Sequence, residues 1–179
     1  GCSLIIKPSE MSPVSSYILG EILHQINFPP GVINILTGPP EKVATTMTKS
    51  KIPSVVTMIG STQTGKQVIA DSSSSIKKLS MELGGNAPFI IFDDANMDAA
   101  LDLAIGIKFG NCGQICVAAN RFFLHENIYD DFLEAYVGRV KKLKLGFGKD
   151  SDADMGPLVN RQGQERMMQI VADATAKGA

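Results

Sequence analysis

Three observations predict an α/β fold built on parallel strands. Short apolar runs rich in β-branched residues alternate along the chain with segments whose apolar residues recur at helical spacing. Glycine and proline separate the two kinds of segment, as in Pro29-Pro30-Gly31. Strands that alternate with helices form right-handed crossovers, which predict a largely parallel sheet covered by helices on both faces.

The predicted strands are short and mostly apolar, and each is bounded by turn-forming residues. In chain order they are Leu4–Lys7, Val32–Leu36, Val55–Ile59, Ser80–Leu83, Pro88–Phe92 and Arg121–His125.

The predicted helices fill the intervals between these strands. They are Pro13–Ile26, Glu41–Thr48, Ser61–Asp71, a long helix from Asp94 to Lys108, Ile128–Lys144 and most of Gly156–Ala176. Asp94 is the predicted N-cap of the long helix, because its side chain can accept a hydrogen bond from the first turn. No repeat of fixed period is found in the sequence.

Composition predicts a soluble globular protein and excludes several classes of function. The 179 residues are 44% hydrophobic and 20% charged with a formal net charge of −1, so we expect neither nucleic acid nor an anionic membrane as a partner. No long apolar run or basic leader predicts a transmembrane helix or a signal peptide. Three cysteines are too few for a disulfide framework and favour the reducing cytoplasm. Both ends of the sequence resemble cuts through a larger protein.

A glycine turn lies between an apolar run and a helix, where residues 60–67 read GSTQTGKQ. The string matches a phosphate-binding P-loop up to its lysine, but Gln67 stands where a magnesium-binding Ser or Thr is required, which disfavours a nucleotide triphosphatase. The backbone N–H groups of such a turn, with the Ser61 hydroxyl, can bind the pyrophosphate of a dinucleotide. The competing interpretation is that Gly60 is needed only for the tight turn.

The string KPSE at residues 7–10 follows the first predicted strand, at the edge where open α/β sheets bind ligands. Lys7 can donate and Glu10 can accept a hydrogen bond to two ribose hydroxyls, and Pro8 would stiffen the turn. A solvated loop with ordinary surface charges is the alternative.

Glu82 lies in the apolar context SMELGG, directly before Gly84-Gly85. A carboxylate flanked by Met81 and Leu83 is expected to be partly desolvated, which suits a general base. The glycine pair allows a backbone to approach a ligand closely. An acid on an edge strand that faces water is the alternative.

Cys112 and Cys116 lie four residues apart in the string FGNCGQICVAANR. A zinc site is excluded because the only histidines, His24 and His125, lack ligand spacing, and no metal is expected. A disulfide between the pair would close a trivial loop in a reducing compartment. A nucleophilic thiol or a buried pair remains, and the small and polar neighbours favour the nucleophile, with a base such as Glu82 nearby.

Six strings occur in a fixed order along the chain: KPSE, PPGVINILTG, GSTQTGK, MELGGNAPFI, GQIC and DMGPLVN. This ordered set, with the spacing between Glu82 and Cys116, resembles the aldehyde dehydrogenase superfamily over essentially all 179 residues. It is most similar to the branch that acts on succinate semialdehyde and related aliphatic semialdehydes. The resemblance implies a Rossmann-like parallel sheet segment, followed by the start of an α/β catalytic domain. Residues 1–84 would be part of the NAD(P)-binding domain, and residues 85–179 the N-terminal part of the catalytic, thiol-bearing domain.

The resemblance implies NAD(P)-dependent oxidation of a small aldehyde to a carboxylate. Cys116 would attack the aldehyde carbon to form a thiohemiacetal and then a thioester, Glu82 would activate the hydrolytic water, and the Cys116 backbone N–H would supply half of the oxyanion hole. NAD is the expected cofactor and NADP the alternative, since a carboxylate at Glu10 would repel a 2′-phosphate. The complete protein would be a homodimer or a homotetramer. The residues implied in cofactor binding are Lys7, Pro8, Ser9, Glu10, Gly60, Ser61 and Leu83.

The chain departs from the family pattern in three respects. The family's second oxyanion donor and its nicotinamide-ribose motif fall outside residues 1–179. Gly110 stands where succinate-semialdehyde enzymes typically carry an arginine, so recognition of a substrate carboxylate is in question. Cys112 replaces a small residue, and mild oxidation is expected to link it to Cys116. The alternatives are an acylating enzyme, in which coenzyme A or phosphate replaces water, and a truncated, non-catalytic dinucleotide-binding fragment.

Overall fold

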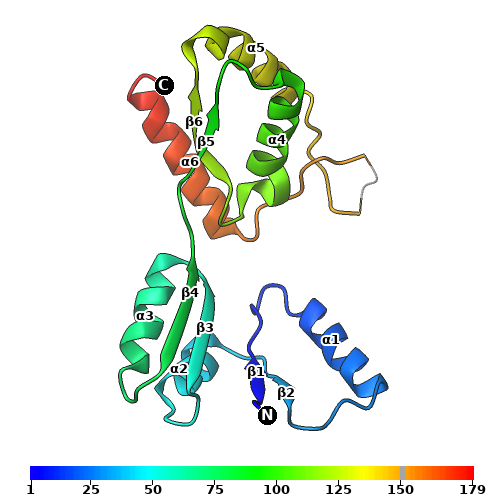
Figure 1. The fold of residues 1–179 in the computed structure, drawn as a ribbon, viewed down its shortest axis with the longest axis vertical. Coiled ribbons are helices and arrows are strands. Elements are labelled where there is room, and N and C mark those ends of the chain that lie inside the picture. The colour runs from blue at the N-terminus through cyan, green and yellow to red at the C-terminus, as the bar shows by residue number, and fades with distance from the viewer. Residues whose placement is uncertain (150–151) are drawn as a thin grey trace. The chain divides into compact units, whose positions relative to one another are not determined.

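The structure is a computed structural model that describes residues 1–149 and 152–179. The chain divides into two compact units, Gly1–Leu83 and Gly84–Ala179, which are coloured along the chain in Figure 1. The division falls one residue from the boundary predicted between residues 84 and 85. A cofactor-binding role for the first unit and a catalytic role for the second stay predictions.

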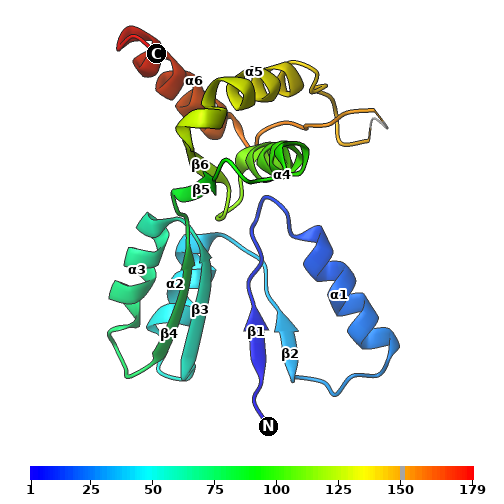
Figure 2. The ribbon, with the colours of Figure 1, turned by 45° about the horizontal axis from the view of Figure 1, so that its top comes forward.

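Two β-α-β segments make up most of the first unit. In the first segment, α1 (Val14–Gln25) joins β1 (Leu4–Ile6) to β2 (Ile33–Ile35), and the strands pair in parallel with Leu4 opposite Ile33. In the second segment, α3 (Thr62–Ser72) joins β3 (Val55–Gly60) to β4 (Lys78–Leu83), with Gly60 opposite Leu83. The helix α2 (Pro40–Lys49) lies between the two segments in the chain and contacts α3. Figure 2 shows α1 alongside the first strand pair and α3 alongside the second.

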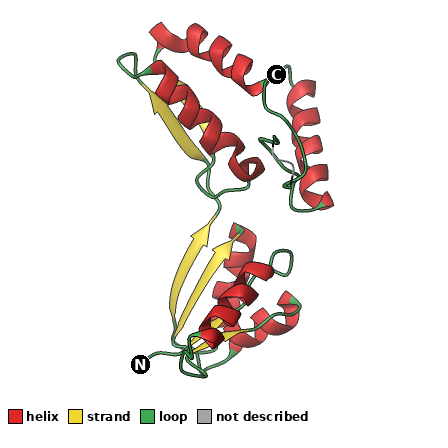
Figure 3. Ribbon diagram, turned by 90° about the vertical axis from the view of Figure 1, so that its right-hand side faces the viewer, coloured by secondary structure: helices red, strands yellow, loops and turns green. Residues whose placement is uncertain are grey.

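The second unit repeats the β-α-β pattern and adds two helices. The helix α4 (Met97–Phe109) and a 3-10 turn, η1 (Gly110–Gly113), join β5 (Ala87–Ile91) to β6 (Ala119–Leu124). These strands also pair in parallel, with Phe89 opposite Phe122. A short 3-10 segment, η2 (Glu126–Ile128), leads into α5 (Tyr129–Val140), and α6 (Arg161–Ala176) follows. Figure 3 distinguishes the strands of each unit from its helices by colour.

The core of the second unit lies where α4 and α5 meet β5. Ile91, Leu101, Ala104 and Phe132 are buried there, with Leu101 only 2% exposed. The ring of Tyr136 stacks on Phe132 at a centroid distance of 5.8 Å. The apolar spacing of the α4 sequence places Leu101 and Ala104 on one face of the helix, which is why both reach this core.

The parallel α/β class predicted from the sequence is confirmed. The expected sheet with helices on both faces is not formed, because the strands of the described residues make three separate two-stranded sheets. One crossover helix covers only one face of each pair. In β3, for example, Val56 and Met58 are half-buried, whereas Ile59 on the opposite face is 81% exposed.

Helix ends differ from the predictions where side chains in the loops decide them. The N-cap of α4 is Asn96 and not Asp94: the Asn96 Oδ1 accepts from the Ala99 N–H at 3.0 Å, while a turn closed by the Ala95 N–H and the Phe92 carbonyl precedes it. Residues 156–159 are not helical. Pro157 disfavours the α region for Gly156, and α6 begins only after its N-cap, Asn160.

We expect Leu101→Ala to destabilise the second unit by about 2–5 kcal/mol, because it leaves a cavity in the core between α4 and α5. Leu103→Ala is the matched control on the same helix, where the side chain is 60% exposed. Urea unfolding of the 179-residue chain, followed by circular dichroism, measures both. Equal losses of unfolding free energy in the two variants would contradict the assignment of Leu101 to the core.

Candidate active site

The glycine turn after β3 ends a strand and starts a helix within two residues. Gly60 is the last residue of β3, and Ser61 is the N-cap of α3. The Ser61 Oγ accepts from the Thr64 N–H at 3.1 Å and lies 2.8 Å from the Thr64 Oγ1. The N–H groups of the first helical residues, Thr62 and Gln63, have no acceptor inside the helix and lie at the positive end of its dipole. This end of α3 therefore offers an anion backbone donors together with the Ser61 hydroxyl.

The second glycine of the string GSTQTGK has a packing role. Gly65 is buried in the first turns of α3, and a Cβ there would lie 2.7 Å from a methyl carbon of Leu83. Gln67, in turn, donates from its Nε2 to the Asp71 Oδ1 at 3.1 Å. Since the helix already begins at Thr62, Gly65 and Lys66 lie within it and do not form a loop around a phosphate. The structure therefore gives the P-loop interpretation no support.

Leu83 packs against this same turn. It is half-buried, its backbone pairs with Gly60, and its side chain covers Gly65. Of the residues implied in cofactor binding, the structure thus brings Gly60, Ser61 and Leu83 together at one end of the β3–β4 pair.

The KPSE turn is held by its own side chains. The Lys7 Nζ donates to the Pro8 carbonyl at 2.9 Å and to the Glu10 Oε2 at 3.3 Å, and the Ser9 Oγ accepts from the Met11 N–H at 3.2 Å. The pKa of Glu10 lies below its ordinary value, chiefly because the carboxylate accepts a hydrogen bond from its own backbone; desolvation opposes this effect, and Lys7 reinforces it. A cation and an ionised carboxylate therefore stand together just after β1.

Glu82 is exposed on β4, where it pairs in register with Ile59. The expected partial desolvation of this carboxylate is wrong for the structure, because alternation along the strand directs Met81 and Leu83 to the half-buried face and Glu82 to the solvent. Glu82 belongs to the first unit and Cys116 to the second. Their pairing therefore stays a prediction.

The loop before Cys116 has an unusual backbone. Asn111, Cys112 and Gly113 have φ values of 48°, 59° and 72°, so three successive residues lie in the left-handed region. This conformation costs a residue other than glycine about 1–2 kcal/mol. Only glycine fits the third position, since a Cβ on Gly113 would lie 2.9 Å from the Lys108 carbonyl oxygen.

Hydrogen bonds hold this loop from within and from outside. Gln114 donates from its Nε2 to the Asn111 carbonyl at 3.0 Å, and Asn111 donates from its Nδ2 to the Gln114 carbonyl at 3.2 Å. The Cys112 Sγ donates to the Gly156 carbonyl at 2.9 Å, and the Gln114 Oε1 accepts from the Val159 N–H at 2.9 Å. The expected oxidative link between Cys112 and Cys116 stays a prediction; to form it, the Cys112 thiol would have to leave Gly156.

Cys116 follows this loop in an exposed turn closed by the Ala118 N–H and the Ile115 carbonyl at 3.0 Å. The Cys116 backbone N–H donates to no acceptor among the described residues. A Cβ on Gly85 would lie 3.4 Å from the Cys116 carbonyl oxygen, so the Gly84-Gly85 turn runs beside the cysteine. An accessible thiol, an available N–H and a glycine backbone alongside are the parts of a covalent acyl-transfer site.

Two adjacent buried alanines anchor the chain just after Cys116. Ala118 and Ala119 are almost fully buried, and Arg121 donates from its Nε to the Asn86 carbonyl at 3.1 Å. The chain just after Gly84-Gly85 and the chain just after Cys116 are therefore tied together at the start of the β5–β6 pair.

The contact between residues 156–159 and the cysteine loop could not be predicted from the sequence. In the sequence, the string DMGPLVN serves only as a marker of the family. Its Gly-Pro pair is a local signal for an extended segment, but nothing local indicates that the segment binds a loop more than 40 residues away.

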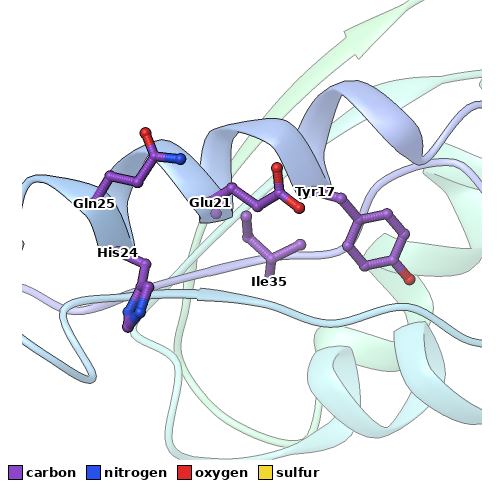
Figure 4. Close-up of a pocket in the computed structure, with 6 residues that line it drawn as sticks. Tyr17, Glu21, His24, Gln25 and Ile35 are labelled. Carbon is purple, nitrogen blue, oxygen red and sulfur yellow. The ribbon is translucent and has the colours of Figure 1, made fainter.

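Other features of the described residues do not form a second site of this kind. A hollow of about 390 Å³ lies beside α1 and contains none of the predicted site residues; Figure 4 shows its lining, which is Tyr17, Gly20, Glu21, His24, Gln25 and Ile35. In the described part of the chain, no group of three or more His, Cys, Asp and Glu residues could hold a metal ion. Over the same residues, no helix is long and apolar enough to cross a membrane.

Comparison with curated proteins finds relatives over the whole chain. The chain is 38% identical over 179 residues to a mitochondrial succinate-semialdehyde dehydrogenase of Oryza sativa subsp. japonica. This match covers 100% of the chain and 34% of that protein. It is 39% identical to a glutarate-semialdehyde dehydrogenase of Pseudomonas aeruginosa and to the NADP(+) succinate-semialdehyde dehydrogenase GabD of Escherichia coli, with 37% of each covered. The chain thus spans about a third of the length of these relatives.

Solved structures give the same result. The structure of a succinate-semialdehyde dehydrogenase from Burkholderia pseudomallei superposes with a TM-score of 0.94 and 42% sequence identity. The match covers 99% of this chain and 37% of the Burkholderia chain. The structure of a betaine aldehyde dehydrogenase from Staphylococcus aureus, in complex with NAD+, superposes with a TM-score of 0.93 and 35% sequence identity. The match covers 99% of this chain and 35% of the Staphylococcus chain. The model of the aldehyde dehydrogenase family matches residues 1–179, and the chain belongs to this family.

Proposed function

We propose that the complete protein oxidises a small aldehyde to a carboxylate with NAD or NADP as hydride acceptor. The observation that carries this proposal is Cys116: an exposed thiol on a braced loop, with its own backbone N–H available beside it. The names of the relatives, all dehydrogenases of aldehydes or semialdehydes in the comparisons above, support the same reaction.

The proposed chemistry begins at the Cys116 sulfur. The thiolate attacks the aldehyde carbon, and the oxygen that becomes negative is stabilised by the Cys116 N–H, an interaction worth about 3–4 kcal/mol in comparable oxyanion sites. Loss of hydride from the thiohemiacetal leaves a thioester on Cys116. Glu82 then takes a proton from water, which attacks the thioester and releases the carboxylic acid.

Chain connectivity supports a role for Glu82. Gly85 lies beside the Cys116 carbonyl, and Glu82 precedes Gly85 by three residues. Because successive Cα atoms are about 3.8 Å apart, the Cα atoms of Glu82 and Gly85 are at most about 11 Å apart. Exposure of the carboxylate to solvent gives it access to the water that hydrolysis consumes. Hydrolysis rather than transfer to coenzyme A or phosphate is therefore the proposed fate of the thioester.

The first unit has groups that suit the pyrophosphate and one ribose of a dinucleotide. The N-terminal N–H groups of α3 and the Ser61 hydroxyl suit a pyrophosphate, and Lys7 with Glu10 suits the two hydroxyls of a ribose. Bound there, the cofactor would supply the hydride acceptor. The ionised Glu10 favours NAD, whereas the name of the Escherichia coli relative specifies NADP(+).

The substrate proposed is an aldehyde that needs no carboxylate clamp from this loop. Gly110 provides no cation, and the nearest lysine along the chain, Lys108, donates from its Nζ to the Asn120 Oδ1 at 2.8 Å. We propose a homodimer or homotetramer in the cytoplasm as the form of the complete protein. For this chain alone, the second candidate is a non-catalytic dinucleotide-binding fragment. It is supported by the length of the chain, which is about a third of the length of each relative.

Cys116→Ala in the complete protein is expected to reduce aldehyde-dependent NADH formation by about a thousandfold or more, because the variant lacks the thiol that carries the acyl intermediate. Cys2→Ala is the matched control, an exposed cysteine outside the site. The absorbance of NADH measures both. Substantial turnover in the Cys116→Ala variant would rule out the assigned nucleophile, and no turnover in the parent protein with any aldehyde would rule out the function.

Glu82→Gln is expected to slow steady-state turnover by about a hundredfold or more while leaving the first turnover fast, because the amide cannot accept the proton of water. Stopped-flow absorbance should then show a burst of NADH followed by a slow phase. Unchanged steady-state turnover would assign the base to another residue. Recovery of full turnover on addition of coenzyme A would favour the acylating alternative.

Ser61 is predicted to have two separable roles. Ser61→Ala removes the N-cap of α3 and should lower stability by about 1 kcal/mol, whereas Ser61→Asp keeps a capping oxygen and should preserve it. The added carboxylate of Ser61→Asp should nevertheless weaken NAD binding by about tenfold or more, since it would lie against the pyrophosphate. Thermal unfolding and an NAD titration of the complete protein measure the two effects. Unchanged NAD binding in Ser61→Asp would place the pyrophosphate elsewhere.

A further inference from the structure

We propose that Cys112 and Gln114 are positioning residues, which tie the loop of residues 110–117 to the segment Gly156–Val159 and so fix the backbone that carries the Cys116 thiol. We call this segment the clamp segment. The inference rests on the proposed function, because it concerns the placement of the same nucleophile.

The two hydrogen bonds that join the loop to the clamp segment lie close together in the sequence of each. Cys112 donates through its Sγ to the Gly156 carbonyl at 2.9 Å, with the Pro157 carbonyl at 3.4 Å. Two residues later, Gln114 accepts through its Oε1 from the Val159 N–H at 2.9 Å. One bond is donated by the loop and the other is accepted by it. A single bond would allow the loop to swing about it, whereas two bonds at separate points fix both its position and its orientation.

The loop needs such attachments because its backbone is strained. Asn111 and Cys112 both have positive φ, a conformation that persists only when the surroundings hold it. The paired bonds between Asn111 and Gln114 stiffen the loop internally. These internal bonds do not fix the loop relative to the rest of the unit. The bonds of Cys112 and Gln114 to the clamp segment fix it there. Gln114 takes part in both sets, two residues before Cys116.

The clamp segment is itself fixed at both ends, so it can serve as a support. On one side Met155 forms an isolated bridge with Leu145, and the Gly146 N–H donates to the Met155 carbonyl at 3.0 Å. On the other side Asn160 caps α6, its Oδ1 accepting from the Gly163 N–H at 2.9 Å. A segment held in this way transmits little motion of its own to the loop.

The role of Cys112 is thus that of a hydrogen-bond donor in a left-handed residue. A thiol is a weak donor, but a half-buried one that lies between two carbonyl oxygens has few competitors for its proton. A serine in its place can also donate. An alanine cannot, and it retains the unfavourable φ.

The experiment compares four variants of the complete protein without cofactor by hydrogen exchange of the amides in residues 110–118. Cys112→Ala and Gln114→Ala should speed this exchange by about tenfold or more, because each loses one attachment to the clamp segment; Gln114→Ala also loses the internal bond to the Asn111 carbonyl. Cys112→Ser should keep it within about threefold of the parent. Asn160→Ala is the matched control: it removes the α6 cap beside the clamp segment and leaves both attachments in place.

Two further measurements connect the loop to the thiol. Alkylation of Cys116 by iodoacetamide, quantified on its peptide by mass spectrometry, should change by about threefold or more in Cys112→Ala and Gln114→Ala only. In the same two variants kcat should fall by about tenfold while the KM for NAD stays within about twofold, since the dinucleotide contacts lie in the first unit. A purely structural defect would instead appear equally in Asn160→Ala.

The inference is overturned if exchange in residues 110–118 is the same in Cys112→Ala as in the parent, or if Asn160→Ala speeds it by the same factor. Failure of the proposed function would appear differently, as a parent protein that oxidises no aldehyde. The exchange and alkylation measurements would still decide whether the clamp segment positions Cys116, because neither needs turnover.

Discussion

The left-handed turn Asn111-Cys112-Gly113 is the constraint on which the candidate site depends. It redirects the chain at the end of α4, so that the residues before β6 form an exposed turn around Cys116 instead of a continued helix. Glycine alone fits its third position. The Gln114 side chain donates to the Asn111 carbonyl at the first position, and the Cys112 side chain at the second donates to Gly156. Reactivity of a thiol depends on its surroundings as much as on its identity, and here the backbone determines those surroundings.

The candidate cofactor groups of the first unit lie where its strands end. Lys7 follows β1, Gly60 ends β3, and Gly84-Gly85 follows β4, so a β-α-β segment repeatedly delivers polar or glycine residues to the carboxyl end of a strand. Open α/β sheets bind ligands at this edge because the helix that follows begins there with unpaired N–H groups. Cys116 is placed differently: it follows α4 and the left-handed turn and precedes β6, so it lies at the amino end of a strand.

Much of this could be predicted from the sequence, because its signals are local. Alternation of strand and helix periods predicts the parallel α/β class, and the residue types of KPSE, GSTQTGK and GQIC predict where polar groups gather. Features that depend on distant contacts could not be predicted. Gly65 matches a phosphate loop, yet it is a glycine because of the Leu83 side chain. The exposure of Glu82 depends on which face of β4 is covered, and the bonds of Cys112 join residues 44 positions apart.

Acid-quenched single turnovers of the complete protein, with peptide mapping by mass spectrometry, identify the residue that carries the acyl group. When an aldehyde and NAD are mixed with the protein and quenched within one turnover, the mass of the acyl group should appear on the peptide that contains Cys112 and Cys116, and fragmentation should place it on Cys116. An acyl group on Cys112, or no acylated peptide while NADH is formed, would show that Cys116 is not the nucleophile.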